Sequence, residues 1–393
     1  MHKSQPTIVM VGGGLQQVTA VKYLQLLGYR VLVVDKNDQA KCRSVSNFFF
    51  NSDGQDHKSI SDFIIKKKRE LNILGIFTLT ELVETVSRVG LATGLPCVSV
   101  KAATLCQNKE LSKNIWLKNG ISTPVGGSFK NKDSIRNFFD NIGRRAFAKP
   151  IKGFGGIGAC ELYNFEDLER YISSYPDLSF VLEEVCRGDM IDVNAYFDKY
   201  GKFVPLGCFD REFDKEVLIE KSGTFPSKLP SRIQSEALEL TKKAALSLGI
   251  NWGPVKADLV STKEGLKILE MAPRLHGPKG TLFLTKMAKG TEHLSHIAPL
   301  LIGQDVDEEK FIKPQLYASF KLIVSPNIPF KVIHGAKEIR EDGCEIMLFK
   351  KSSSRVIRYR NSSDAIGYVF AACEKYSDLE DKLNGALKKI YFE

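Results

Sequence analysis

Four glycines within six residues constrain the fold of this chain more than any other feature. They lie in the run from Gly153 to Gly158, directly after a short apolar segment that ends in Ala148, Lys149 and Pro150. Glycine N–H groups can approach an anion without a Cβ in the way, so a strand that delivers a lysine into such a loop is typical of a phosphate cover. It is no Walker loop, because the lysine precedes the glycines. The alternative, a glycine-rich hairpin, gives Lys149 no function.

Two carboxylates on a predicted β-hairpin form a candidate metal site. The strand of Asp258 is expected to pair with the strand of Glu270 across a five-residue turn, with Val260 opposite Leu266. In this register Asp258 faces Ile268, and Glu270 lies one diagonal away on the same face. Mg²⁺ prefers hard oxygen ligands and often binds one or two carboxylates together with substrate phosphates. An ordinary hairpin with acids on its solvated face is the alternative.

The run from Val181 to Gly188 has the composition of a hinge that contacts a nucleotide base. An apolar strand leads into two acids, and backbone groups at such a point can hydrogen-bond an adenine while a carboxylate holds a sugar or amino group. The residues that can serve this hinge are Glu183, Glu184, Val185 and Cys186. Taken alone, the segment is better explained as an ordinary strand end.

A loop after the second carboxylate carries a candidate phosphate ligand. Arg274 follows Glu270 by four residues and could hold a transferring phosphoryl group or a substrate carboxylate through two hydrogen bonds. His276 either contacts substrate or is a loop histidine with ordinary partners. His293 and His296 form an HxxH pair without a supporting acid, and we interpret them as the surface of a helix.

The chain opens with a predicted βαβ unit and then continues in two further units. The opening consists of a strand over residues 7–11, three glycines, a helix over 15–27 and a strand over 30–34 that ends in Asp35. Further strands are expected near 73–78 and 97–100. Asn108 is a predicted N-cap for a helix over 109–118, and residues beyond about 314 read as a smaller β-rich unit with a final helix.

Composition narrows the classes of function. With 393 residues and 43% hydrophobic content, two or three globular domains are expected, and without a signal-like or membrane-length segment we expect a cytoplasmic protein. The eight cysteines are scattered, which favours reduced thiols. The net charge of +10 includes basic clusters at 66–69 and over 350–360, but neither interleaves with aromatic residues. An anionic small substrate explains this charge as well as a nucleic acid does.

The order of these segments resembles the ATP-grasp superfamily, and within it the carboxylate-amine ligases, especially L-amino acid ligases and relatives of carbamoyl phosphate synthetase. The segments that carry the resemblance stand in family order: residues 12–16 with Asp35, residues 108–124, Lys149 with the glycine loop, residues 183–188, and Asp258 with Glu270 and Arg274. Two positions depart from the family pattern. Met190 stands where an acid often holds the ribose, and Ala272 stands where an asparagine often ligates metal.

The resemblance implies an α/β protein with the ATP-grasp fold. A Rossmann-like N-terminal domain would span 1–108, the ATP-grasp domain 109–313 with a lid subdomain at about 146–208, and a C-terminal α+β subdomain 314–393. The implied metal ligands are Asp258 and Glu270, and the implied catalytic residues are Arg274 and Lys149. The implied nucleotide contacts are Lys109, Lys149, Gly153, Gly155, Gly156, Glu183, Glu184, Val185 and Cys186.

The resemblance also implies a reaction. ATP with Mg²⁺, or with Mn²⁺ as an alternative, would activate a small-molecule carboxylate as an acyl phosphate that an amine attacks, with release of ADP and phosphate. It implies no nucleic-acid or membrane partner and leaves a homodimer open. Three other functions remain. One is a nicotinamide oxidoreductase, which is disfavoured because Gln17 stands in place of the third glycine of the dinucleotide fingerprint. The others are a nucleotide sensor or scaffold without catalysis and a bicarbonate-activating carboxylase relative.

Overall fold

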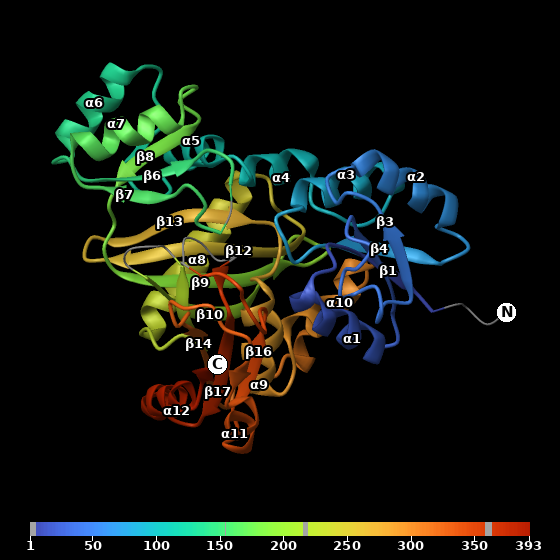
Figure 1. Ribbon diagram of the computed structural model, residues 1–393. Coiled ribbons are helices and arrows are strands. Elements are labelled where there is room, and N and C mark those ends of the chain that lie inside the picture. Colours follow the sequence, from blue (N-terminus) through green and yellow to red (C-terminus); the bar gives the residue numbers. More distant parts are fainter. Residues whose placement is uncertain (1–4, 154, 215–218, 358–363) are drawn as a thin grey trace.

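The N-terminal unit is a parallel sheet with helices on both faces. The computed structural model describes residues 5–153, 155–214, 219–357 and 364–393. The sheet has the order β3-β2-β1-β4 and appears in blue in Figure 1. Its strands are β1 (Thr7–Val11), β2 (Arg30–Asp35), β3 (Phe48–Asn51) and β4 (Ile73–Phe77). Its helices are α1 (Val18–Leu26), α2 (His57–Lys67), α3 (Val83–Thr93) and α4 (Val100–Cys106).

The glycine turn after β1 is closed by its own acid. Asp35 at the end of β2 accepts a hydrogen bond from the Gly13 N–H at 2.7 Å and another from the Asn37 N–H at 2.9 Å. The predicted βαβ opening is therefore confirmed. The predicted strand at 97–100 is wrong, because Ser99 caps α4 by accepting from the Ala102 N–H at 3.2 Å, and the helix begins at Val100.

A small antiparallel sheet forms the second unit. Its order is β5-β8-β6-β7, and α6 and α7 pack on it through one apolar cluster that includes Phe139, Leu168 and Ile172. The strands are β5 (Gly126–Gly127), β6 (Ala146–Pro150), β7 (Cys160–Leu162) and β8 (Phe180–Glu184). The helices are α6 (Lys132–Asn141) and α7 (Phe165–Ser174). Figure 1 shows this unit above the large sheet; α5 (Lys109–Lys118) leads into it from α4, and the segment between β8 and β9 leads from it to the large sheet.

The third sheet is large and antiparallel, with the order β13-β12-β9-β10-β11-β14-β17-β16. Its strands are β9 (Asp189–Phe197), β10 (Phe203–Phe213), β11 (Glu220–Phe225), β12 (Gly253–Thr262), β13 (Gly265–Ala272), β14 (Tyr317–Ile323), β16 (Glu345–Leu348) and β17 (Gly367–Cys373). Because β9 and β10 pair within this sheet, part of the predicted lid range at 146–208 belongs to it. The C-terminal strands extend the same sheet through the β11–β14 pair.

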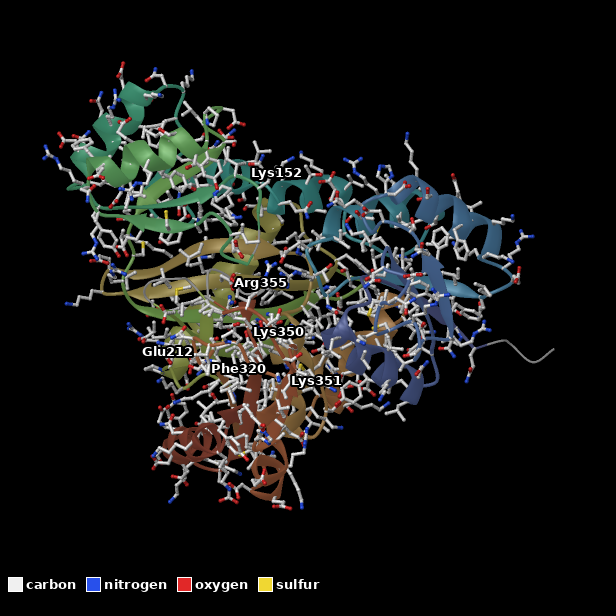
Figure 2. All side chains as sticks on the ribbon, viewed as in Figure 1. Lys152, Glu212, Phe320, Lys350, Lys351 and Arg355 are labelled. Carbon is white, nitrogen blue, oxygen red and sulfur yellow. The ribbon has the colours of Figure 1, made fainter. Side chains whose placement is uncertain are left out.

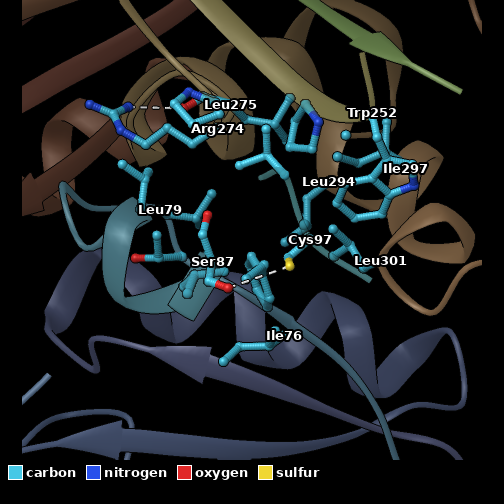
Figure 3. A pocket seen from close by; sticks show the side chains of 18 residues that line it. Ile76, Leu79, Ser87, Cys97, Trp252, Arg274, Leu275, Leu294, Ile297 and Leu301 are labelled. Carbon is cyan, nitrogen blue, oxygen red and sulfur yellow. Dashed lines mark hydrogen bonds between the residues drawn. The ribbon is translucent and has the colours of Figure 1, made fainter. Parts of the chain in front are cut away.

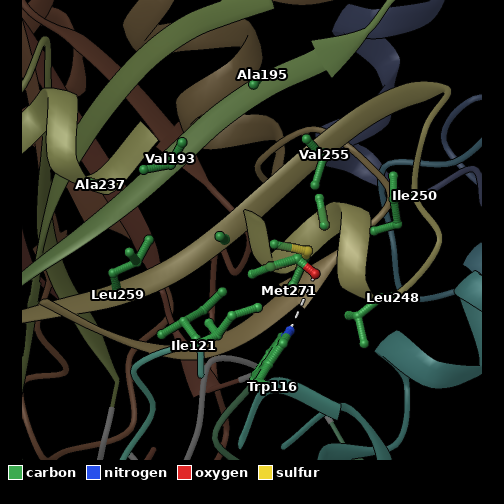
Figure 4. Packing of buried hydrophobic residues seen from close by; sticks show 14 of the residues in the cluster. Trp116, Ile121, Val193, Ala195, Ala237, Leu248, Ile250, Val255, Leu259 and Met271 are labelled. Carbon is green, nitrogen blue, oxygen red and sulfur yellow. Dashed lines mark hydrogen bonds between the residues drawn. The ribbon is translucent and has the colours of Figure 1, made fainter. Parts of the chain in front are cut away.

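The core beneath the predicted metal hairpin joins helices from different parts of the chain. Trp116 of α5 is buried and its Nε1–H donates to the Ala244 carbonyl of α8 (Ser231–Ser247) at 3.4 Å. Figure 4 shows this contact beside Met271 of β13 and Val255 of β12. Burial of these side chains fixes α5, and thereby the lysines that it carries, against the large sheet.

The remaining elements lie beside the large sheet. The helices are α9 (Thr285–Lys289), α10 (His293–Leu301), α11 (Ala336–Glu341) and α12 (Tyr376–Lys388), with 3-10 turns at Leu15–Gln17 and Glu308–Lys310 and a π-helix at Lys279–Leu284. The short strands β15 (Ile333–His334) and β18 (Tyr391–Phe392) pair with each other. Within the described ranges, no helix is both long enough and apolar enough to cross a bilayer.

The predicted histidine surface on α10 is wrong for His293. Its ring is fully buried and meets the edges of Phe209 and Phe225 at centroid distances of 5.9 and 5.4 Å. The helix packs the face that carries His293 against aromatic side chains of β10 and β11. This contact cannot be predicted from the polar character of the two histidines. His296, one turn further, contacts Phe311 with ring centroids 5.1 Å apart.

The two basic clusters have local structural explanations. Lys67 ends α2 and pairs with Glu70 at 2.7 Å, while Lys68 donates to the Thr93 carbonyl at 2.6 Å. Lys350 donates to the Ala365 carbonyl at 3.0 Å, and Figure 2 shows it with Lys351 and Arg355 on the C-terminal segment. Residues 358–360 of the second cluster lie outside the described residues.

Candidate active site

One cavity of about 1090 Å³ lies between the small sheet and the large sheet. It reaches from the glycine loop to β10, β11 and α12. The predicted site residues on its wall are Lys109, Lys149, Gly153, Gly155, Gly156, Glu183, Glu184, Val185, Cys186, Asp258 and Glu270. Segments more than a hundred residues apart in the sequence therefore meet at one cavity, large enough for a nucleotide and a second molecule.

A buried triad of charges fixes the lysine that precedes the glycine loop. The Glu183 carboxylate pairs with Lys149 Nζ at 2.8 Å and with Lys113 Nζ at 2.9 Å, and all three side chains are at least nine-tenths buried. Burial raises the pKa of Glu183, but the two ammonium groups outweigh it and hold that pKa below its usual value. The Glu183 side chain thus orients Lys149, a role that differs from the predicted contact with the nucleotide.

Lys113 is a site residue that the sequence reasoning missed. It lies four residues after Lys109 on α5, so both lysines project from the same face of that helix. That spacing was the available signal. Lys109 Nζ donates to the Gly153 carbonyl at 2.9 Å and lies 3.8 Å from Glu270 Oε2. The helix therefore connects the glycine loop to the carboxylate end of the cavity.

The hinge after β8 is held by side-chain contacts and by close packing. Glu184 pairs with Lys267 at 2.6 Å and accepts from the Val125 N–H at 2.8 Å. A Cβ on Gly188 would lie 1.9 Å from the Ser261 carbonyl oxygen, so a glycine is required where the hinge passes the large sheet. Val185 and Cys186 line the cavity between these two anchors.

The two predicted metal carboxylates are direct cross-strand neighbours. Asp258 pairs with Glu270, and a β-bulge follows, after which Val260 pairs with Lys267. The predicted register, with Val260 opposite Leu266, is wrong for two physical reasons. The turn leaves only two residues between Thr262 and Gly265, and the bulge absorbs one residue of β13. Both changes bring the two carboxylates closer than the predicted diagonal.

A network of alternating charges supports Asp258. Its carboxylate accepts from Lys256 Nζ at 2.9 Å and from Arg211 Nη1 at 2.8 Å. Arg211 also pairs with Glu220 at 2.9 Å, and Glu220 pairs with Lys279 at 2.6 Å. Burial raises the pKa of Asp258, but Lys256 and Arg211 outweigh it and hold that pKa well below its ordinary value. The sequence reasoning missed Arg211 altogether and gave Lys256 no binding role.

Glu270 has the opposite electrostatic environment. Burial and the nearby negative charge of Asp258 raise its pKa. Two adjacent carboxylates on a cavity wall fit a hard divalent cation, which would relieve their repulsion. Among the described residues no group of three or more His, Cys, Asp or Glu side chains forms a metal site. The remaining ligands of a cation here would be phosphate oxygens and water.

Arg274 is not among the described residues that line this cavity, and its side chain instead lines a separate cavity of about 30 Å³ (Figure 3). Its Nη2 pairs with the Glu81 carboxylate of the N-terminal unit, and its Nη1 donates to the Leu275 carbonyl at 2.9 Å. His276 is buried, with Nδ1 2.7 Å from Asp192 Oδ2 and its ring stacked on Phe209 at 5.3 Å. His276 thus has the ordinary partners of a structural histidine.

Comparison with known proteins agrees with this geometry. A family model described as an ATP-grasp domain matches residues 149–281, from the lysine before the glycine loop to the π-helix. Residues 149–281 therefore form an ATP-grasp domain. The predicted α/β ATP-grasp fold is thereby confirmed. The matched range contains the hinge, the carboxylate pair and Arg274.

Solved structures with a similar fold cover almost the whole chain. The crystal structure of an L-amino acid ligase from Bacillus licheniformis superposes with a TM-score of 0.85 at 16% identity, covering 100% of this chain and 99% of that one. An N5-carboxyaminoimidazole ribonucleotide synthetase from Thermotoga maritima gives a TM-score of 0.77 at 18% identity and 98% coverage of both chains. At these identities the likeness shows the fold.

Two relatives are similar to this chain in sequence. A formate-dependent phosphoribosylglycinamide formyltransferase from Sulfurisphaera tokodaii is 22% identical over 98% of this chain and 96% of its own length. A 3-methyl-D-ornithine–L-lysine ligase from Methanosarcina acetivorans is 24% identical over 80% of this chain and 78% of its own length.

Proposed function

We propose that this protein is an ATP-dependent ligase that activates a small-molecule carboxylate as an acyl phosphate and joins it to an amine, with release of ADP and phosphate. The observation that carries the proposal is the pairing of Asp258 and Glu270 across from Lys109 and Lys149 in one cavity. Paired carboxylates with facing ammonium groups suit a metal-bound nucleotide triphosphate. The ligase names of an L-amino acid ligase and a 3-methyl-D-ornithine–L-lysine ligase support the reaction class.

The proposed roles of the residues follow from their charges. Asp258 and Glu270 would hold Mg²⁺, or Mn²⁺ in its place, and such a metal would supply Lewis-acid polarisation of phosphoryl oxygens. Lys149, fixed by Glu183, and Lys109, which contacts Gly153, neutralise phosphate charge that builds up during transfer. Val185 and Cys186 present the hinge backbone to the adenine. Arg274 is proposed to act on the carboxylate or the transferred phosphoryl group because it follows Glu270 by four residues, although its side chain lines a separate cavity.

The amine is expected in the part of the cavity away from the glycine loop. This part is lined by β10 and β11 and by Tyr376 and Glu380 of α12. Lys228 crosses it, donating to the Tyr376 hydroxyl at 2.9 Å. Because the C-terminal strands extend the large sheet, the α12 wall has a fixed position relative to Asp258 and Glu270. We therefore assign substrate choice to residues 210–214 and 219–230 and to α12, while residues 215–218 of the predicted substrate loop lie outside the described residues.

A screen for ADP release tests the proposal. Purified protein is incubated with ATP and Mg²⁺ and with pairs of carboxylates and amines, including L-amino acids in both roles, and ADP is measured by a coupled assay. Amine-dependent ADP release together with an amide product is expected. Release with bicarbonate alone would instead favour a carboxylase-type enzyme. ATP binding without turnover for any pair would favour a sensor or scaffold, and NADH binding without ATP binding would overturn the nucleotide assignment.

A further inference from the structure

Arg211 reaches the cavity beside the predicted metal carboxylates. It stands on β10 in register with Met190 of β9, and β9 lies between β10 and the strand that carries Asp258. Its Nη1 donates to Asp258 Oδ1 at 2.8 Å, and the residue forms part of the cavity wall. Lys256, the other cation on Asp258, is not among the described residues that line the cavity. The Asp258 network therefore presents its positive charge to the cavity through Arg211.

The guanidinium of Arg211 is held from several sides. Its Nε donates to Glu220 Oε1 at 2.9 Å, and Lys279 Nζ donates to Glu220 Oε2 at 2.6 Å. Lys279 packs against two aromatic rings, whose centroids lie 4.4 and 4.2 Å from its Nζ. Burial raises the pKa of Glu220, but Arg211 and Lys279 outweigh it and hold that pKa well below its usual value. The ring centroid of Phe213 lies 4.7 Å from the guanidinium carbon. Arg211 thus has a fixed and permanently charged anchor.

One nitrogen of this guanidinium is left for a ligand. Nε is taken by Glu220 and Nη1 by Asp258, whereas Nη2 has no hydrogen-bond partner within the described part of the chain. The side chain is 14% exposed, and the residue lines the cavity. A planar guanidinium that is fixed at two nitrogens presents the third in a defined direction, and carboxylates are among the anions that such a group binds best.

The position of Arg211 favours the substrate carboxylate over the phosphates of ATP. Lys109 and Lys149 line the cavity on the side of the glycine loop and are the cations expected to meet the phosphates. In the large sheet, Arg211 lies beyond Asp258, on the side away from the strand of Glu270 and next to β11, where the amine is expected. The carboxylate must lie between the phosphoryl group that it attacks and the amine that attacks it. Arg211 occupies this intermediate place.

We propose that Arg211 is a catalytic residue of the ligase reaction, which binds the carboxylate that becomes the acyl phosphate. Its Nη2 holds one carboxylate oxygen while the other attacks the γ-phosphoryl group, and Glu220 is a positioning residue that orients the guanidinium. This inference rests on the proposed function. It assigns to the large sheet a substrate contact separate from the metal site and from the hinge.

Hydroxylamine makes the test independent of the natural amine, because it converts an acyl phosphate to a hydroxamate and releases phosphate. Each L-amino acid of the screen serves as the carboxylate with ATP and Mg²⁺, and the hydroxamate is measured. Arg211→Lys keeps the charge but loses the planar fork, so KM for the carboxylate should rise about 10- to 100-fold. KM for ATP should stay within about threefold, because a positive charge remains beside Asp258.

Glu220→Gln carries the test if Arg211→Lys does not fold. This variant keeps Arg211 and its contact with Asp258 but weakens the anchor on Nε, so the same KM should rise by a smaller factor while KM for ATP is unchanged. Arg136→Lys is the matched control. Arg136 also pairs through Nε with a glutamate, Glu169, at 2.8 Å, but it lies on α6 outside the cavity wall, so both KM values should stay at wild-type level.

The ratio of the two KM values decides between a substrate contact and mere support of Asp258. If KM for the carboxylate stays at wild-type level in Arg211→Lys, or in Glu220→Gln where that variant carries the test, the proposal is wrong. A rise confined to KM for ATP would likewise assign Arg211 to the support of Asp258 alone. If the wild-type protein forms a hydroxamate with none of the carboxylates, the proposed function itself fails, which the wild-type assay shows before any variant is compared.

Discussion

At the scale of single residues, Glu183 should be important for stability because its one carboxylate balances the charge of two buried ammonium groups. Glu183→Gln would leave Lys149 and Lys113 close together without an anion, and breaking a buried pair in this way costs about 3–5 kcal/mol. We expect a loss of that order in the free energy of unfolding, measured by urea denaturation. Glu184→Gln, one residue later and more exposed, should cost less than about 1 kcal/mol. Equal losses in the two variants would contradict the triad.

The carboxylate pair gives a second prediction at this scale. Asp258→Asn and Glu270→Gln should each abolish turnover, because either change removes one of two charges available to a divalent cation. The two variants should differ in stability. Asp258→Asn removes one of the two anions that Lys256 and Arg211 share, the other being Asp192, whereas Glu270→Gln removes a like-charge neighbour. Two measurements separate these effects: electron paramagnetic resonance follows the binding of Mn²⁺ with ATP, and thermal unfolding follows stability. Wild-type metal binding in both variants would rule out the site.

Sequence reasoning found the residues that stand in local patterns. Lys149 precedes a glycine loop and Glu270 ends a strand, so both could be named from their neighbours. Lys113 and Arg211 could not, because their partners Glu183 and Asp258 lie 70 and 47 residues away. Only the folded sheets bring such pairs together. For the same reason, the pairing of Arg274 with Glu81, which is 193 residues distant, could not be predicted.

At the scale of elements, α5 has the boundaries that its capping residues predict. The Asn108 side chain accepts from the Leu111 N–H at 3.0 Å, and the helix runs over Lys109–Lys118. Asn108→Ala should lower the free energy of unfolding by about 1 kcal/mol and also weaken ATP binding, because this cap sets the start of the helix that carries Lys109. Asn114→Ala, on the exposed face of the same helix, is the control for both measurements. Unchanged ATP affinity in Asn108→Ala would show that the cap does not position Lys109.

The hairpin of β12 and β13 marks the limit of prediction from periodicity. Alternation of apolar residues identified both strands, but a bulge changes the register by one residue without altering the composition on either side. The extension of the large sheet by β14, β17 and β16 likewise could not be predicted from the sequence. It depends on the pairing of β11 with β14, whose residues are about a hundred positions apart.

At the scale of the whole molecule, the half-buried His296 should couple stability to pH. Burial and the nearby positive charge of Lys289 lower the pKa of His296 from 6.5 to about 4. Between these two pH values the unfolded chain binds more protons than the folded protein, so stability should fall as pH decreases from 6.5 toward 4. His296→Gln should flatten this part of the dependence of the unfolding midpoint on pH. Identical slopes in the variant and the wild type would show that His296 does not couple stability to pH.

Nucleotide binding should stabilise the molecule as a unit, because the cavity walls come from both the small and the large sheet. A ligand that binds only the folded state at 100 times its Kd adds about 2.7 kcal/mol to the free energy of unfolding. We therefore expect ATP with Mg²⁺ to raise the midpoint of thermal unfolding, and GTP to raise it less if the hinge backbone reads adenine. Lys149→Ala should lose most of the rise at the same ATP concentration. Lys152→Ala, whose exposed side chain lies three residues further on and outside the cavity wall, should keep it. A rise that survives in Lys149→Ala would mean that the nucleotide binds elsewhere on the protein.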